Sequence, residues 1–136
     1  MTETIPAIRT VVVERQFAHP PEKLWRALTQ PQLIADWLMQ SDFAPVEGHK
    51  FRFTADWGGV DCEVTEVEPI TVLAYRWAAM GLDSVVTWTL TPRDGGTWLR
   101  LEQEGFKPDQ EYAYQGARNA WPAYFTAIES VVAKLD

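Results

Sequence analysis

Two histidines and one cysteine are the side chains of this sequence best suited to bind a metal ion or act as a nucleophile. His19 precedes a proline-rich helix start, and His49 stands in a glycine turn. Neither has a second ligand at helical or hairpin spacing, and one cysteine does not complete a zinc set. Cys62 falls on the apolar side of an expected strand, where a buried thiol is normally inert. We therefore predict no catalytic residue, no metal site and no cofactor.

Three polar residues on apolar strand faces are the remaining candidates for chemistry. Gln103, Tyr75 and Arg15 each alternate with apolar residues, so each shares the inward side of its expected strand. Such groups can orient a carbonyl or hydroxyl of a ligand. They can equally satisfy one another, because a buried polar atom needs a partner whether or not a ligand exists. Both interpretations remain open.

The longest element that must position these residues is an expected helix over 112–135. Its apolar residues recur in steps of three and four and therefore share one face. They are Tyr114, Ala117, Trp121, Tyr124, Phe125, Ile128, Val131, Val132 and Leu135. Asp109 is a candidate cap for the start of this helix. Pro122 removes one backbone donor, so we expect a kink or a break near Trp121.

The chain before this helix is predicted to form one strand, two short helices and about six further strands. Residues 8–17 alternate as a strand, and Pro21 and Pro31 mark the starts of the short helices. Five of the later strands are expected around 51–57, 60–68, 73–77, 86–91 and 99–104, with turns at Gly58-Gly59, 81–83 and 92–96. Short turns favour an antiparallel meander, and the alternation gives it one apolar face.

These elements predict a single α+β domain over 1–136, with its core at about 8–135. A curved antiparallel sheet wrapped on one long helix buries every apolar face at once. A gap between helix and sheet is where a ligand would bind. The predicted walls of this cavity are Trp37, Met39, Phe53, Cys62, Tyr75, Trp77, Trp88, Leu101, Gln103, Trp121 and Phe125. Seven tryptophans fit either an aromatic-lined pocket or a core of large residues, and the sequence leaves this choice open.

Charge and composition exclude several classes of partner. The net charge of -7, with scattered basic residues, argues against nucleic acid and against an anionic membrane surface. One cysteine permits no internal disulfide, and no apolar run reaches the length of a membrane span. Residues 1–6 are polar and lack the apolar core of a signal peptide. We therefore expect a reduced, cytoplasmic protein.

Several stretches resemble the activator of heat-shock-protein-90 ATPase homologue family, within the START-like (SRPBCC, helix-grip) superfamily. The similar segments are Ala18–Pro31, Leu33–Trp37, Gly48–Phe53, Thr97–Phe106 and Trp121-Pro122. The resemblance implies a six- to seven-stranded antiparallel sheet gripping a long C-terminal helix. It also implies two short helices after the first strand and a hydrophobic cavity.

Three functions follow from the pattern and the resemblance. The first is non-enzymatic binding of a small hydrophobic or aromatic molecule in the cavity. The second is a protein-interaction module of the chaperone-cofactor type, although the eukaryotic activators carry a separate N-terminal domain for which these 136 residues leave no room. The third is a cyclase- or hydrolase-type enzyme using the same cavity. The segment Leu38-Met39-Gln40 departs from the aromatic, proline-rich family pattern, so the cavity mouth is expected to differ. Monomer and homodimer, through a sheet edge or Trp98, both remain open.

Overall fold

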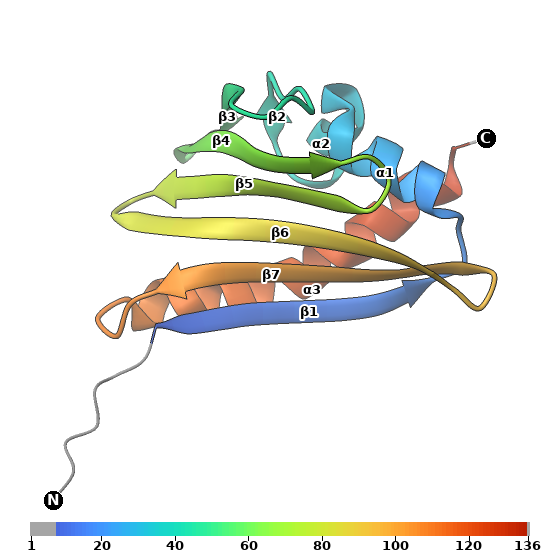
Figure 1. Cartoon of the computed structure of the whole chain (residues 1–136). Helices are drawn as coiled ribbons and strands as arrows, with labels where there is room; N and C mark the ends of the chain where they lie inside the picture. Colours follow the sequence, from blue (N-terminus) through green and yellow to red (C-terminus); the bar gives the residue numbers. More distant parts are fainter. Residues whose placement is uncertain (1–7, 136) are drawn as a thin grey trace, which may run out of the picture.

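The computed structural model describes residues 8–135 and shows one antiparallel sheet backed by three helices (Figure 1). In chain order the elements are β1 (Arg9–Phe17), α1 (Pro21–Thr29), α2 (Pro31–Trp37), β2 (Gln40–Ser41), β3 (Lys50–Ala55), β4 (Gly58–Glu68), β5 (Val72–Ala79), β6 (Leu82–Arg93), β7 (Gly96–Phe106) and α3 (Glu111–Ala133). The strand order is β1-β7-β6-β5-β4-β3-β2, and every neighbouring pair is antiparallel. The predicted α+β helix-grip architecture is confirmed.

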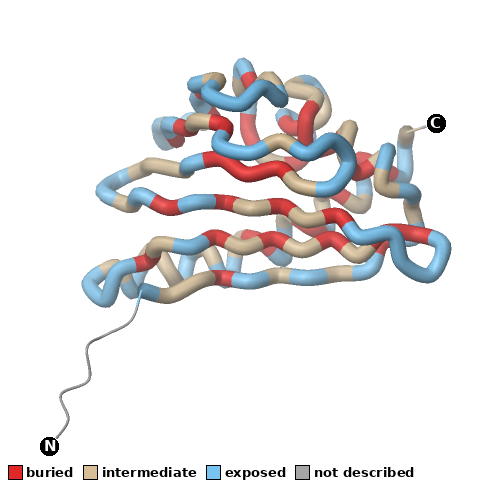
Figure 2. The backbone as a smooth tube through the Cα atoms, viewed as in Figure 1, coloured by how far each residue is buried: buried red, intermediate tan, exposed pale blue. Residues whose placement is uncertain are grey.

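All three helices cover the same face of the sheet. Helix α3 runs obliquely behind β1 and β7 and ends beside α1 and α2 (Figure 1). Residues along the strands alternate between buried and exposed positions, as a sheet with one covered face requires (Figure 2). On β6, for example, Val86, Trp88 and Leu90 are buried, as their alternation predicted. The core therefore lies between the inner face of the sheet and α3.

Two predicted hairpin turns are shifted by tertiary pairing. The β3–β4 turn is Asp56-Trp57, because Ala55 pairs with Gly58 and both predicted turn glycines begin β4. Gly59 is needed for close approach, since a Cβ there would lie 2.6 Å from the carbonyl oxygen of Phe53. The next turn likewise falls one residue earlier than predicted, because Ala79 pairs with Leu82. The short strand β2, which pairs with β3, was missed by sequence reasoning because two residues carry no alternation.

Of the kink or break expected near Trp121, the break does not occur. Helix α3 is continuous from Glu111 to Ala133 with Pro122 inside it. Pro122 lies on the exposed side, where water can solvate the carbonyl group that its ring leaves without a donor. Packing of the buried stripe against the sheet holds the helix together across this position.

The prediction that Asp109 caps α3 is wrong. The N-cap residue is Gln110, and its side chain makes no capping hydrogen bond. Instead Gln110 Oε1 accepts from the backbone nitrogen of Lys107 at 2.9 Å, and Nε2 donates to the carbonyl oxygen of Gly81 at 3.0 Å. The start of α3 is therefore fastened to the β5–β6 turn rather than closed by its own cap.

Candidate functional site

Aromatic side chains fill most of the space between the sheet and α3. Trp88 is at the centre, with its ring centroid 5.6 Å from those of Trp37 and Trp121 and 5.8 Å from that of Phe125. Of the eleven predicted cavity walls, all but Trp77 are buried. Contacts at these distances stabilise a core beyond their buried area. Most of the predicted cavity is thus a core of large side chains.

A small pocket of about 170 Å³ remains at one end of this space. Its lining residues are Trp77, Leu82, Gln103, Phe106, Ala113, Gly116, Ala117, Ala120, Trp121 and Tyr124, and we call it the helix–sheet pocket. Of the predicted walls, it brings together Trp77, Gln103 and Trp121. The other eight do not line it. Gly116 is exposed and Trp77 is half-buried, so the pocket reaches the surface.

The pocket exists because the first half of α3 is lined with small residues. Ala113, Gly116, Ala117 and Ala120 are spaced by three, one and three positions and so face the sheet together. Sequence reasoning counted Ala117 in the apolar stripe but overlooked the other three. The signal was present as a run of Ala and Gly at helical spacing immediately before the bulky Trp121.

A short hydrogen-bond network forms the inner end of the pocket. Gln103 Oε1 accepts from Trp121 Nε1 at 2.8 Å, and Gln103 Nε2 donates to Ser84 Oγ at 3.0 Å. Ser84 Oγ donates in turn to the carbonyl oxygen of Trp77 at 3.0 Å. A glutamine amide offers two N–H groups and two lone pairs. Within residues 8–135, one N–H group and one lone pair of the Gln103 amide therefore have no hydrogen-bond partner.

Tyr75 is buried away from the helix–sheet pocket. Its hydroxyl accepts a hydrogen bond from Trp88 Nε1 at 3.0 Å, and burial raises the pKa of Tyr75 above its ordinary range. The predicted polar set is therefore split, with Gln103 at the pocket and Tyr75 inside the aromatic core. Tyr75 and Trp88 satisfy one another, which is the structural alternative left open by the sequence.

Arg15 does not lie in the cavity. It crosses from β1 to the outside of α3, where its guanidinium donates to Thr126 Oγ1 at 3.2 Å and to the Pro122 carbonyl at 3.4 Å. The alternation of β1 did place Arg15 on the helix-facing side. Because β1 is the outermost strand, that side reaches solvent at its border.

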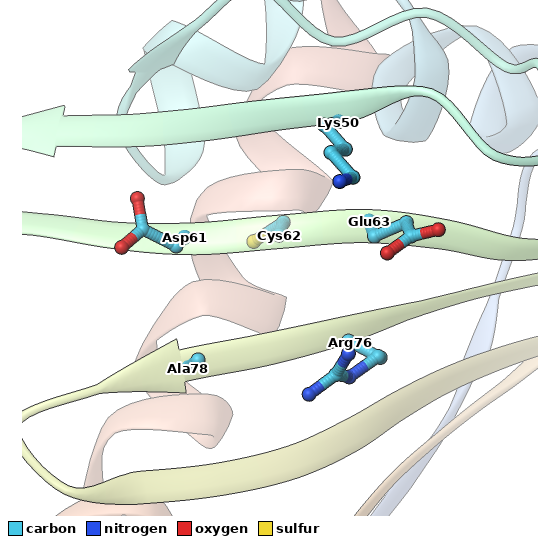
Figure 3. A pocket seen from close by; sticks show the side chains of 6 residues that line it. All are labelled: Lys50, Asp61, Cys62, Glu63, Arg76 and Ala78. Atoms are coloured by element: carbon cyan, nitrogen blue, oxygen red, sulfur yellow. The ribbon is translucent and has the colours of Figure 1, made fainter.

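Cys62 is buried on β4, and burial raises the pKa of its thiol from 9.0 to about 12. A thiol that stays protonated at neutral pH is a poor nucleophile. Cys62 also borders a shallow hollow on the outside of β3, β4 and β5, where charged side chains of both signs alternate (Figure 3). Two of them belong to exposed ion pairs, Arg52–Asp61 and Arg76–Asp83, which normally contribute little stability. The charged side chains around this hollow are those of an ordinary outer sheet face that is exposed to water.

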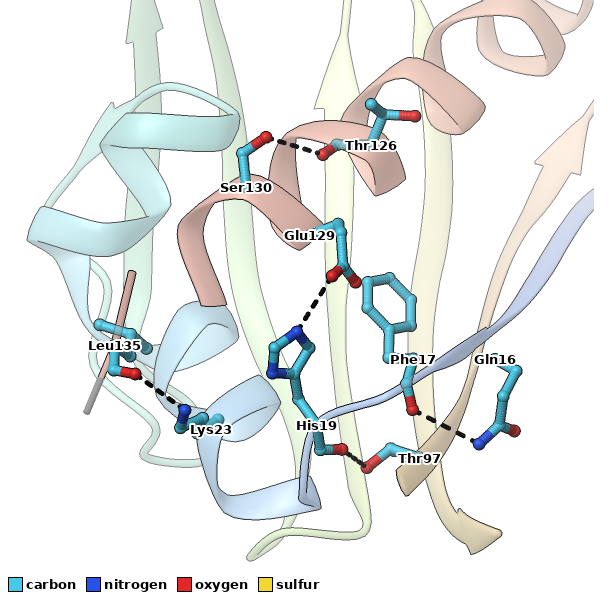
Figure 4. Close-up of polar contacts among 9 residues, drawn as sticks. All are labelled: Gln16, Phe17, His19, Lys23, Thr97, Thr126, Glu129, Ser130 and Leu135. Atoms are coloured by element: carbon cyan, nitrogen blue, oxygen red, sulfur yellow. Dashed lines mark hydrogen bonds and ion pairs between the residues drawn. The ribbon is translucent and has the colours of Figure 1, made fainter. Parts of the chain in front are cut away.

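Both histidines hold segments of the fold together. His19 Nε2 lies 3.0 Å from a carboxylate oxygen of Glu129, and the carbonyl of His19 accepts from Thr97 Oγ1 at 2.7 Å (Figure 4). These contacts join the start of α1 to α3 and β7. His49 Nε2 donates to the carbonyl of Asp42 at 2.8 Å. Within residues 8–135 no three His, Cys, Asp or Glu side chains are grouped as a metal site requires. None of the helices described could cross a bilayer.

Comparison with known proteins places this architecture in a family. The family model described as "Activator of Hsp90 ATPase homolog 1-like protein" matches residues 18–133. None of the curated proteins compared matches the chain. The crystal structure of MLL2253 from Mesorhizobium loti is 56% identical, with a TM-score of 0.91 over 94% of this chain and 99% of that protein.

Two more distant structures share the fold. DynU16, from the dynemicin biosynthetic locus, is 23% identical with a TM-score of 0.83, over 92% of this chain and 47% of DynU16. The Aha1 dimer from Colwellia psychrerythraea is 18% identical with a TM-score of 0.80, over 91% of this chain and 96% of that protein. From the family match and the START-like helix-grip architecture, we conclude that the chain belongs to the Activator of Hsp90 ATPase homolog 1-like family.

Proposed function

We propose that this protein binds a small, neutral aromatic molecule in the helix–sheet pocket and does not catalyse its conversion. The observation that carries the proposal is the spare hydrogen-bonding capacity of Gln103 at the inner end of an otherwise apolar pocket. Ligand sites typically combine apolar walls with a few placed polar groups. The helix-grip family membership supports the same kind of role.

The size of the pocket limits the ligand. An apolar protein cavity of about 150 Å³ holds a molecule as large as benzene. The volume of about 170 Å³ therefore suits one aromatic ring with a small substituent. The indole groups of Trp77 and Trp121, with centroids 5.7 Å apart, provide the aromatic wall.

The lining also selects for a neutral ligand. It contains no acid, lysine, arginine or histidine, so a charged molecule would lose hydration without gaining an opposite charge. Tyr124 is the one lining residue with an ionisable side chain, and burial raises the pKa of its hydroxyl. A proton-transferring cyclase or hydrolase needs a group that titrates nearer neutral pH, so the pocket favours binding over catalysis.

The experiment is native mass spectrometry of freshly purified protein, followed by denaturing extraction and a direct titration. Benzamide, a neutral ring with an acceptor carbonyl, is the probe, and benzoate is its charged counterpart. We expect benzamide to quench or shift tryptophan fluorescence saturably, and benzoate to have at least tenfold lower affinity. Ala120→Leu should fill the pocket and abolish the response. Ala123→Leu, on the exposed side of the same helix, should leave it unchanged.

Two results would overturn the proposal. One is an equal response of Ala120→Leu and wild type, which would place the binding elsewhere. The other is no saturable response to benzamide together with no co-purified mass in the wild-type protein. Circular dichroism and thermal unfolding of both variants would verify that each is folded.

A second candidate is a chaperone-interaction module, with a cytoplasmic location that the buried, unpaired Cys62 also fits. It is favoured by two exposed large side chains, one in the β5–β6 turn and one at the start of α3. These two segments lie at the same end of the sheet (Figure 1) and are joined by the hydrogen bond from Gln110 to Gly81. Met80 is 93% exposed and Tyr112 is 94% exposed. The test is stimulation of a heat-shock-protein-90 ATPase, which the double variant Met80→Ser/Tyr112→Ser should weaken. No stimulation by the wild type would eliminate this function.

A further inference from the structure

The outer edge of β1 borders a hollow to which neither of the functions considered above gives a role. In the sheet order β1 is outermost and pairs only with β7. The other edge strand, β2, has two residues, whereas β1 has nine. The free edge of such a strand presents unpaired backbone N–H and C=O groups that can pair with an added strand.

This edge and α3 together form a groove of about 710 Å³. One side consists of five consecutive residues of β1, Thr10 to Glu14, and the other of Tyr114, Arg118 and Pro122 from α3. Five residues of an extended chain span about 17 Å. The β1–α3 groove is therefore long enough to hold a short strand beside β1, with its side chains against the helix.

Positive charge gathers along this groove although the chain is acidic overall. Arg9 and Arg118 lie 3.8 and 5.7 Å from the ring centroid of Tyr114. Arg15 lies at the far end, against Pro122 and Thr126. Arg9 is paired with Glu111, but Arg15 and Arg118 form no ion pair with any residue from 8 to 135.

The carboxylate of the groove does not neutralise these arginines. Glu14 forms an ion pair with Arg100 at 3.0 Å and accepts a hydrogen bond from Trp98 Nε1 at 2.8 Å, so its carboxylate is held by other partners. Neither Arg15 nor Arg118 therefore has a carboxylate within ion-pair distance among residues 8–135. Glu111, whose pKa is lowered by the hydrogen bond from Gln115 and also by Arg118, is already paired with Arg9. Both guanidinium groups can bind an incoming carboxylate. Arginine binds carboxylates through paired N–H donors, which favours acidic side chains at these positions.

The same charges disfavour a second copy of this chain. If β1 paired antiparallel with β1 of a second copy and the two Val12 residues faced each other, Arg15 would lie opposite Arg9 of the copy. If the two Val13 residues faced each other instead, Arg15 would lie opposite Val11 of the copy, and its guanidinium would have no carboxylate to pair with. Like charges placed opposite one another destabilise strand pairing, and charged side chains at an edge are a common protection against self-association.

We propose that the β1–α3 groove binds an extended acidic peptide segment of a partner protein as an eighth strand. The backbone of the segment pairs with Thr10 to Glu14, and alternate acidic side chains point toward α3 and meet Arg118 and Arg15. Its other side chains lie beside Val12, which is exposed on the outer face. This site is separate from the helix–sheet pocket, so either proposal can fail without the other.

The test measures fluorescence anisotropy of a labelled acidic peptide, Val-Glu-Thr-Glu-Thr-Glu-Val, against the full-length protein. The same peptide with lysine in place of glutamate is the charge control. We expect saturable binding of the acidic peptide, weaker at high salt, and at least tenfold weaker binding of the lysine peptide. Arg118→Glu, at an exposed position, should weaken binding at least tenfold. Arg52→Glu, on the outside of β3, should leave it within twofold.

Backbone pairing is tested on the peptide itself, which avoids any effect on the fold of the protein. Two versions carry N-methyl groups at alternate residues, in opposite phases. Strand addition predicts that one phase abolishes binding and the other preserves it, because only alternate N–H groups face β1. Equal effects of both phases, equal loss in Arg52→Glu, or no binding of the acidic peptide would overturn the proposal. So would a dimer in sedimentation analysis that Val12→Lys converts to monomer.

Discussion

Trp121 Nε1 donates to Gln103 Oε1 over 2.8 Å and thereby joins the buried face of α3 to the middle of β7. Both side chains are buried, and Gln103 also holds Ser84 on the neighbouring strand. The network positions Trp121 as a wall of the helix–sheet pocket, and it leaves one N–H group and one lone pair of the Gln103 amide without a partner in residues 8–135. Structure and proposed binding thus depend on the same glutamine.

We predict that Gln103→Leu lowers the free energy of unfolding by about 1–3 kcal/mol, because it leaves the buried indole N–H of Trp121 without an acceptor. Trp121→Phe removes that donor, so the double variant should be less destabilised than the sum of the single variants. Urea unfolding of all four proteins measures the coupling. Additivity within about 0.5 kcal/mol would show that the bond contributes nothing specific.

The raised pKa of Cys62 predicts a loss of stability at alkaline pH. The pKa rises from 9.0 to about 12 on folding, so the thiolate forms first in the unfolded chain. The contribution of the protonated Cys62 thiol to the free energy of unfolding is therefore complete below pH 9. It is lost as the pH rises from 9 toward 12, by up to about 1.4 kcal/mol per pH unit.

Cys62→Ala removes this titration and should flatten the decline in unfolding free energy between pH 9 and pH 10. Urea unfolding at pH 7.5, 9 and 10 makes the comparison, and the difference between the two proteins cancels the other groups that titrate in this range. If the free energy of unfolding declined equally in wild type and variant, the decline could not be assigned to Cys62.

Gly116→Ala should stabilise the protein by about 0.5–1 kcal/mol. Gly116 is inside α3, and a Cβ built there meets no atom within 4 Å, so the change removes the entropic cost of a helical glycine without a clash. Gly59→Ala is the matched opposite, because its Cβ would lie 2.6 Å from the Phe53 carbonyl oxygen. Thermal unfolding should raise the midpoint for Gly116→Ala and lower it for Gly59→Ala. The same sign in both would refute the steric argument.

The start of α3 gives a further pair of variants. Gln110→Ala loses the hydrogen bonds to the Lys107 nitrogen and the Gly81 carbonyl, and should cost about 1 kcal/mol of unfolding free energy. Asp109→Ala, at an exposed position outside the helix, should change stability by less than about 0.5 kcal/mol. Chemical denaturation would show the contrast. A larger effect at Asp109 would restore the capping role expected from the sequence.

The sequence by itself determined the order of elements and the inward face of most of them. Val86, Trp88 and Leu90 alternate along β6, and Trp121, Phe125 and Ile128 recur at helical spacing along α3. These residues are buried as predicted, because the period of each element decides which side chains share a face. Residues such as Cys62 could likewise be placed inside from the strand pattern alone.

The tertiary structure decided which inward residues form a pocket and which fill the core. Trp88 and Trp77 both lie on inward faces, yet Trp88 is enclosed by rings from α2 and α3 while Trp77 faces the small residues of α3. That outcome depends on the oblique path of α3 across the sheet. Only the strand order made β1 a free edge and put Arg15 at its border rather than inside. Such packing choices depend on contacts between distant segments, which a local residue pattern does not contain.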